Sequence, residues 1–255
     1  MIALGVLTYV LMASGADAGP PGPSPAAGVQ VVRLVAQLDA LHGRRDEPAA
    51  LAEARRVADA AIAAAPTDYR VLWRAARERF TESDVPMLAA EQRARLGQEA
   101  YELAQRAIAA NPNDVAGHYW AALSIGSAAE SMGVLRALAS GVEGKFKRPL
   151  ARATALDETY DHGGVPVVWA AYYLELPWPK RDRAKAAQQA QRALAINPAN
   201  LRARFYQARI AADEGRPVEA RALLAAIATA PVGAYDPPEE RRVKKEAAAL
   251  AATLR

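Results

Sequence analysis

The sequence predicts an all-α fold in which helical hairpins stack into an α–α superhelix of about ten or eleven helices. Three observations predict it: a helix-favouring composition, a short phrase that recurs where helices should end, and a helical apolar period between the copies. Alanine, leucine and arginine dominate the 255 residues, and these residue types strongly favour helix. Aromatic residues make up only 6%, so small side chains must do most of the packing between closely stacked helices.

The recurring phrase defines the repeat. Its copies are AIAAAPTD at residues 61–68, AIAANPND at 107–114, ATALDETY at 153–160, ALAINPAN at 193–200 and, more weakly, AIATAP at 226–231. Its reference position, proline in four copies, falls at residues 66, 112, 158, 198 and 231, with steps of 46, 46, 40 and 33. Because the tetratricopeptide (TPR) period is about 34 residues, the sequence predicts TPR-like hairpins with longer helices or inserts in the earlier repeats.

Each part of the phrase has a physical role at a helix end. The alanines allow one helix to approach its neighbour closely, and the proline cannot continue the helix. An Asn or Asp just beyond can cap the next helix by accepting hydrogen bonds from its free backbone N–H groups. Each copy therefore marks the end of the second helix of one repeat and the start of the next repeat.

The apolar periodicity between the copies predicts the individual helices. Gly215 and Pro217 predict a tight turn inside the last full repeat. Asp236, followed by two prolines, predicts the N-cap of a charged terminal helix that covers the end of the superhelix. The predicted helices span residues 29–42, 48–65, 68–81, 86–110, 114–130, 134–156, 165–175, 181–196, 200–213, 217–229 and 238–254.

The N-terminal segment has the pattern of an export signal. Residues 2–13, IALGVLTYVLMA, are too few to span a membrane but match the hydrophobic region of a secretory signal. Ala16 and Ala18 supply small residues for cleavage, so residues 1–18 are predicted to be a signal peptide; the alternative is an apolar tail that is disordered or packed. Residues 19–28 are predicted to be a Pro/Gly-rich spacer, and residues 29–255 the TPR-like domain.

Charge and cysteine content exclude several classes of function. The 32 basic and 28 acidic residues give a net charge of +4, and the basic runs at 44–45 and 241–245 are flanked by acids. A solvated helix face is therefore favoured over a nucleic-acid interface. With no cysteine, the chain lacks disulfides, thiol nucleophiles and cysteine zinc sites, and a lipoprotein anchor is not supported.

Motifs for catalysis, metals and cofactors are missing, so the sequence predicts no enzyme, no cofactor and no metal. No metal-binding spacing joins the three histidines, which are His42, His118 and His162. The most polar cluster lies at residues 157–162, where an acid/base pair or a metal site is the alternative to a plain turn between repeats. The turn is favoured, with Asp161 near a helix start and the glycines at 163–164 allowing an unusual backbone.

The aromatic residues are few, yet they gather between residues 119 and 178. Core packing is the simpler interpretation, and the alternative is a groove or cavity into which the polar tips of Tyr and Trp side chains reach. The candidate residues for binding a ligand or partner are Tyr119, Trp120, Tyr160, His162, Trp169, Tyr172, Tyr173 and Trp178.

Two segments carry a family resemblance. GHYWAALSIG at 117–126, and DETYDHGGVP at 157–166 followed by PWP at 177–179 and an Asp-x-x-Lys-Ala stretch at 182–186, resemble the T-component (TatT) family of TRAP transporters. The resemblance implies a periplasmic TPR-like protein that associates with the substrate-binding protein of a TRAP-type solute transporter. It also implies that the chain forms a homo-oligomer, for which a trimer has been proposed in the family. It brings no catalytic residues, and the missing lipoprotein cysteine is a departure from it.

Three hypotheses about function follow. The first is a non-catalytic periplasmic protein that binds a transporter's substrate-binding protein and has a cavity for a small ligand. The second is a general TPR scaffold for protein–protein interaction in the cell envelope. The third, which is disfavoured, is an enzyme that uses the region around Asp161 and His162.

Overall fold

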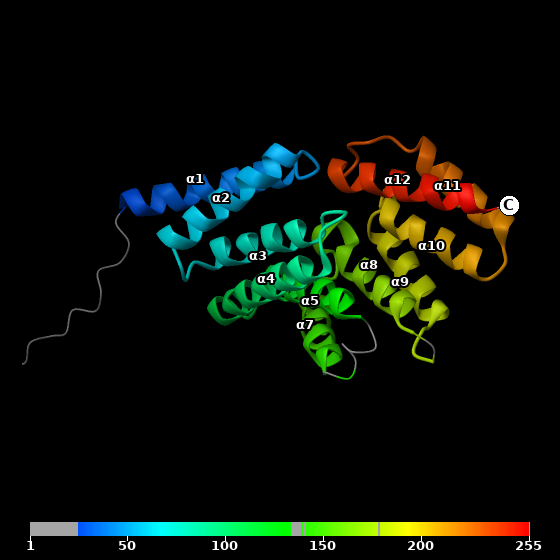
Figure 1. Ribbon diagram of the computed structural model, residues 1–255, viewed down its shortest axis with the longest axis horizontal. Coiled ribbons are helices and arrows are strands. Elements are labelled where there is room, and N and C mark those ends of the chain that lie inside the picture. Colours follow the sequence, from blue (N-terminus) through cyan, green and yellow to red (C-terminus); the bar gives the residue numbers. More distant parts are fainter. Residues whose placement is uncertain (1–24, 134–138, 140, 178, 255) are drawn as a thin grey trace, which may run out of the picture.

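The computed structural model describes residues 25–133, 139, 141–177 and 179–254, and over these it is a stack of helical hairpins without strands (Figure 1). The predicted signal peptide, most of the predicted spacer and Trp178 lie outside the described residues. The helices of the described part are α1 (Pro25–His42), α2 (Pro48–Ala64), α3 (Tyr69–Ser83), α4 (Ala90–Ala110), α5 (Val115–Met132), α7 (Val142–Asp157), α8 (Tyr160–Glu175), α9 (Arg183–Ile196), α10 (Leu201–Asp213), α11 (Pro217–Thr229) and α12 (Pro237–Thr253).

The predicted all-α repeat fold is confirmed, and most helices begin and end within a few residues of their predicted limits. Three starts differ by at least four residues, among them that of α4, which begins at Ala90 rather than at residue 86. Helix α1 begins at Pro25, so the last residues of the predicted spacer are helical, with the proline in the first turn where its missing N–H costs nothing. The start of the predicted helix at 134–156 lies outside the described residues, and its described part is α7, which begins at Val142 after Gly141 in a left-handed conformation. Helix α8 begins at Tyr160 rather than at residue 165.

Alternate helices form the inner layer of the superhelix. Helices α1, α3, α5, α8, α10 and α12 contact one another in that order, and α2, α4, α7, α9 and α11 pair with them as outer helices. Each copy of the recurring phrase closes an outer helix, as the sequence predicts. The stack curves so that α12 returns toward the turn between α1 and α2 (Figure 1).

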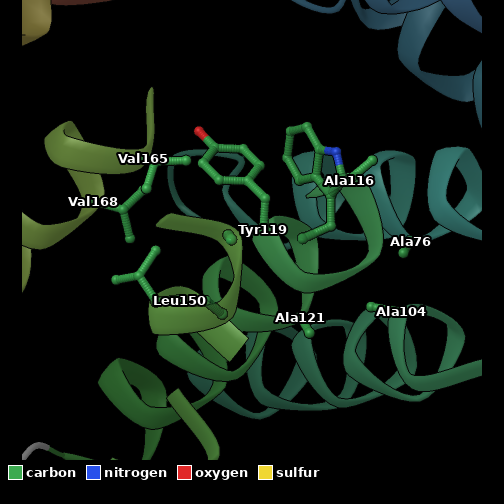
Figure 2. Packing of buried hydrophobic residues seen from close by; sticks show 11 residues of the cluster. Ala76, Ala104, Ala116, Tyr119, Ala121, Leu150, Val165 and Val168 are labelled. Atoms are coloured by element: carbon green, nitrogen blue, oxygen red, sulfur yellow. The ribbon is translucent and has the colours of Figure 1, made fainter. Parts of the chain in front are cut away.

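Alanines bring the outer helices close to the inner ones. Ala61, Ala107, Ala153 and Ala193 hold the same place in four copies of the phrase, and each is 0% exposed. In the fifth copy Ala226 is exposed and the next residue, Ile227, is buried instead, so this weak copy is displaced by one residue. Figure 2 shows the alanine layer between α3, α4 and α5, where Ala76, Ala104 and Ala121 lie near one another.

The predicted caps form at three of the inner helices. Asp68, Asp114 and Asn200 each accept a hydrogen bond from a backbone N–H in the first turn of α3, α5 and α10. Asp236 occupies the predicted N-cap position of α12, but its carboxylate makes no capping bond there. It binds the guanidinium of Arg45 instead, with Nη1 2.9 Å from Oδ1. Charge pairing with a distant residue has replaced local capping at this helix.

Candidate functional site

The inner helices surround a central cavity of about 960 Å³. Its wall draws residues from every inner helix, from His42 at the end of α1 to Glu246 in α12, and from the outer helices α2, α4 and α7. Pockets for small molecules have volumes of about 300–1,000 Å³, so this cavity is large enough to hold one. An occupant would contact several repeats at once.

One wall of the cavity is apolar and aromatic. Phe80 and Trp120 lie with their ring centroids 5.7 Å apart, and both line the cavity. Further along, Phe146 stacks on Tyr172 at 5.2 Å, and the hydroxyl of Tyr172 donates to Glu143 Oε1 at 2.6 Å. Rings that are fixed by packing and by hydrogen bonds of this kind offer a preformed surface to a ligand.

A left-handed turn brings Asp161 to the cavity. The φ angle is positive at three successive residues, at 54° for Asp161, 57° for His162 and 84° for Gly163. Residues other than glycine rarely adopt this conformation. The turn places the Asp161 carboxylate against Tyr119, whose hydroxyl donates to Oδ2 at 2.7 Å. Gly164 is required beside it, because a Cβ there would lie 2.5 Å from the Tyr119 hydroxyl.

Burial and the neighbouring Asp161 raise the pKa of Tyr119 far above its ordinary value. The phenol therefore stays protonated and acts as a hydrogen-bond donor, not as a base. Tyr119 projects from α5 toward Val165 and Val168 of α8 (Figure 2), so the same side chain joins two inner helices and lines the cavity between them. Its first role is to hold Asp161 in place.

The structure brings only some of the predicted site residues to the cavity. Tyr119, Trp120 and Tyr172 line it. Tyr160 packs behind them, where its hydroxyl accepts a hydrogen bond from Trp120 Nε1 at 3.3 Å. The others point elsewhere or lie outside the described residues: His162 packs against Tyr235, Trp169 stacks on Tyr173 and donates to Thr154, and Trp178 is among the residues not described.

Sequence reasoning missed several residues of the wall. Phe80, Tyr206 and Tyr235 line the cavity from α3, α10 and the loop before α12. So do Arg241 and Arg242, which the sequence placed on a solvated face. The helical period alone shows which face of a helix is apolar, but not that α12 curves back to face α1, so no local signal could have found these residues.

Acidic groups outnumber basic groups around the cavity, in a chain of net positive charge. Nine carboxylates and six Lys or Arg side chains line it, whereas the whole chain carries +4. Most of the carboxylates pair with an arginine or lysine, but Glu130 in the last turn of α5 makes none of the described ion pairs. Burial, Asp84 and Glu175 together raise the pKa of the Glu130 carboxyl above its ordinary value. The neutral form of this carboxyl is therefore favoured more than in an exposed glutamate, and a further cation beside it would offset the charges of Asp84 and Glu175.

A second polar group reaches the cavity wall at the end of α1, through His42. The Nδ1 atom of His42 lies 3.2 Å from Glu78 Oε1, and Glu78 also accepts from Arg77 Nε at 2.8 Å. Burial and Arg77 lower the pKa of His42, so its ring is neutral at pH 7. The edge of the ring meets Trp120 at 6.2 Å. This group joins α1 to α3 and supports the aromatic wall.

The arrangement does not assemble a reactive centre at residues 157–162. Asp161 faces the cavity, but His162 turns to Tyr235, and the structure gives no contact between the two side chains. Within the described residues, no group of three or more His, Asp or Glu side chains is placed to hold a metal ion. The helices of that same part of the chain are all too short or too polar to cross a membrane.

Comparison with known proteins gives one family and a shared fold. The family model described as Regulator of microtubule dynamics protein 1-3 matches residues 34–163. The crystal structure of a thermophilic TPR protein from Thermus thermophilus is similar over 88% of this chain and 97% of its own, with 21% identity and a TM-score of 0.61.

The crystal structure of MamA protein is similar over 86% of this chain and 96% of its own, with 14% identity and a TM-score of 0.44. A search of curated proteins finds no match. The likeness to the Thermus protein shows a TPR-like fold.

Proposed function

Since the chain belongs to the family described as Regulator of microtubule dynamics protein 1-3 and has a TPR-like fold, we propose that it is a non-catalytic scaffold that binds a protein partner and holds a small ligand in its central cavity. The observation that carries the proposal is the cavity of about 960 Å³, which is lined by every inner helix. A plain spacer between proteins would not need a cavity with an aromatic wall.

The proposed partner is the substrate-binding protein of a TRAP-type solute transporter in the periplasm. The motifs at residues 117–126 and 157–166, which resemble the TatT family, support this partner. Both motifs contribute to the cavity, through Tyr119, Trp120 and Asp161. On this proposal residues 1–18 direct export, and the chain acts as a homo-oligomer, which the family resemblance suggests is a trimer. The alternative function is that of a general TPR scaffold in the cell envelope.

An affinity capture tests the partner. The tagged chain is incubated with a periplasmic extract, and bound proteins are identified by mass spectrometry, with excess untagged chain as the competitor. We expect a solute-binding protein that the competitor displaces. Recovery of envelope proteins without any solute-binding protein would favour the general scaffold and exclude the transporter role.

The excess of acidic groups around the cavity favours a ligand that carries an amine over a ligand that carries a carboxylate. Glu130 makes none of the described ion pairs, and Phe146 and Tyr172 also line the cavity. A carboxylate beside aromatic faces attracts an ammonium group through charge and cation–π interaction, and an anion would meet the acidic excess instead. We therefore expect 2-phenylethylammonium to bind more tightly than 3-phenylpropanoate, which has an anionic group in place of the ammonium.

Isothermal titration of both probes tests the ligand. Glu130→Gln should weaken binding of the ammonium probe about tenfold, since hydrogen bonds to charged groups are worth about 1.5–3 kcal/mol. Glu91→Gln is the matched control, because Glu91 lies in the first turn of α4 and does not line the cavity. Equal affinity of both probes for the unaltered protein would contradict the proposed ligand class.

The family description favours a second candidate partner. It says that members of the family regulate microtubule dynamics, and the match covers residues 34–163, which hold much of the cavity wall. Co-sedimentation with polymerised tubulin tests it. Pelleting of the chain with microtubules, at a level that excess untagged chain reduces, would favour the cytoskeletal partner over the periplasmic one.

A further inference from the structure

The two ends of the superhelix face each other across the mouth of the cavity. The turn between α1 and α2 at residues 43–47 and the end of α3 lie on one side, and the first turns of α12 lie on the other (Figure 1). The residues that meet here are far apart in sequence, by 158 to 195 positions. What holds the two ends together therefore decides how wide the mouth of the cavity is.

Three ion pairs join the two ends. The guanidinium of Arg45 binds the Asp236 carboxylate with both terminal nitrogens, at 2.9 and 2.5 Å. In the reverse direction, Arg241 binds Asp46 through Nε at 2.6 Å and Nη2 at 3.0 Å. The third pair joins Arg242 of α12 to Asp84 at the end of α3.

The first two pairs are reciprocal. Each end supplies one arginine and one aspartate: Arg45 and Asp46 on the α1–α2 turn, Arg241 and Asp236 at α12. The bond from Arg241 lowers the pKa of Asp46, and the same bond raises the pKa of Arg241. Both groups are charged at neutral pH, so the pair attracts the two ends to one another.

Apolar packing does not reinforce this closure. The buried cluster of α1 to α3, with Leu38 and Val57, shares no residue with the cluster of α10 to α12, with Phe205 and Val243. No α-carbon of α12 lies within 8 Å of an α-carbon of α1, α2 or α3. The ends therefore touch through long charged side chains, whereas every other neighbouring pair of inner helices is packed directly.

The six side chains of these pairs all line the cavity. Arg241 and Arg242 are 44% and 48% exposed, so solvent ions reach them and screen their two pairs more than the half-buried pair of Arg45 with Asp236. In a superhelix each repeat contacts only its neighbours, so small rotations at each interface add up to a large displacement at the ends. Loss of the pairs would therefore widen the mouth of the cavity without unfolding any repeat.

We propose that the pairs Arg45–Asp236, Asp46–Arg241 and Asp84–Arg242 form an electrostatic clasp that holds the two ends together at the mouth of the central cavity and lets the mouth widen when the pairs are broken. When the pairs are formed, the narrow mouth retains a bound ligand. When the pairs are broken, the wider mouth lets a ligand enter or leave. The role of the clasp in ligand access rests on the proposed function, but the movement itself does not.

Pulsed electron–electron double resonance tests the movement directly. The chain has no cysteine, so Ala52→Cys in α2 and Ala248→Cys in α12 would carry the only two spin labels, at exposed helical positions on either side of the clasp. We expect one narrow distance at 50 mM salt. At 1 M salt, where the screening length falls to about 3 Å, a longer and broader population should appear.

Charge reversal and exchange show whether the pairs are the cause. Arg241→Asp should raise the ratio of long to short distances by up to about fivefold at low salt, the upper range for one exposed pair. Combining Asp46→Arg with Arg241→Asp restores the pair with its charges exchanged, and should return the short distance. Arg44→Gln is the matched control, since Arg44 pairs locally with Glu47 on the same turn.

Two results would overturn the clasp: a distance distribution that neither salt nor Arg241→Asp changes, or an exchanged pair that stays as open as the single variant. Because the salt titration uses the chain with its clasp residues intact, poor folding of Arg241→Asp would still leave the clasp open to refutation. The distance measurements are made without ligand or partner. A negative result in them therefore leaves the capture and titration experiments unaffected, and negative results in those experiments leave the proposed clasp unaffected.

Discussion

The junction between α4 and α5 and the junction between α7 and α8 come from the same repeated phrase but take different conformations. At the first, Asn111 is extended, its N–H bonds to the Ala107 carbonyl at 2.9 Å, and Pro112 follows. At the second, Glu158 stands at the proline position and stays in the right-handed helical region. The chain therefore reverses later, at Asp161 to Gly163, in a left-handed turn.

The difference shows how one substitution in a repeat can create a site. A proline forces the residue before it out of helix, so the regular junctions turn at once. Without it the turn moves downstream, and strained residues of this kind are often found where a protein binds or reacts. Here the delayed turn delivers the carboxylate of Asp161 to the cavity wall, whereas the regular junction before α10 brings the amide of Asn200 there.

The largest effect is expected from placing the proline of the regular junctions at position 158 of the irregular junction. Glu158→Pro would push Asp157, the last residue of α7, out of its helical conformation and should lower the free energy of unfolding by about 3 kcal/mol in urea denaturation. Glu158→Ala is the control, since it loses only the exposed pair with Arg192 and should cost less than about 1 kcal/mol. Equal stability of the two variants would mean that the proline position does not decide the junction.

The regular junction should be sensitive to size instead. Ala107 is 0% exposed, and the backbone of Gly117 in α5 packs against it, so Ala107→Leu should destabilise the fold by about 2 kcal/mol through overpacking. Ala109→Leu, at an exposed position two residues later, should leave the urea midpoint nearly unchanged. If both variants are equally stable, the proposed repeat register is wrong.

The irregular junction should be sensitive at its glycine. Gly164→Ala places a Cβ 2.5 Å from the Tyr119 hydroxyl and 3.0 Å from Asp161, and should cost about 1–2 kcal/mol and break the bond between those two side chains. Gly144→Ala is a control in α7, where the nearest atom belongs to the flexible Arg148 and a small gain in stability is expected. Thermal unfolding of both variants checks the contrast.

The smallest effect concerns the cap of a regular junction. Asp68 accepts from the Arg70 backbone N–H at 2.8 Å, so Asp68→Ala should cost about 1 kcal/mol, whereas Asp68→Asn keeps the cap. The Arg70 side chain lowers the pKa of Asp68, so its stabilisation is present above the ordinary value near 3.8 and is lost as pH falls through the lower folded value. Acid titration of stability should therefore be flatter in Asp68→Asn than in the unaltered chain.

The sequence predicts local features well because their causes are local. The alanines, prolines and capping residues of the phrase act on their own helix and its nearest neighbour, so Asp68, Asp114 and Asn200 could be assigned as caps from the sequence alone. The role of Asp236 could not, because Arg45, which its carboxylate binds, lies 191 residues away. The curvature that brings them together is a sum of small angles between repeats, which no single segment encodes.

Among the aromatic candidates, the outcome depends on helix geometry. Tyr172 and Tyr173 are neighbours in sequence, but a helix turns by about 100° per residue, so only Tyr172 faces the cavity. Composition showed where aromatic residues gather, while the direction of each side chain needed the position of α8 relative to α5 and α7.

The clasp also sets an order of events in folding. Nearly all contacts of a helical repeat protein are local in sequence, and local contacts form quickly. Arg45 can meet Asp236 only after the intervening hairpins have formed and curved, so these ion pairs belong to the last step of folding. Interactions that are absent from the transition state change the rate of unfolding and leave the rate of folding unaltered. The ion pairs between the two ends therefore slow unfolding without changing the rate of folding.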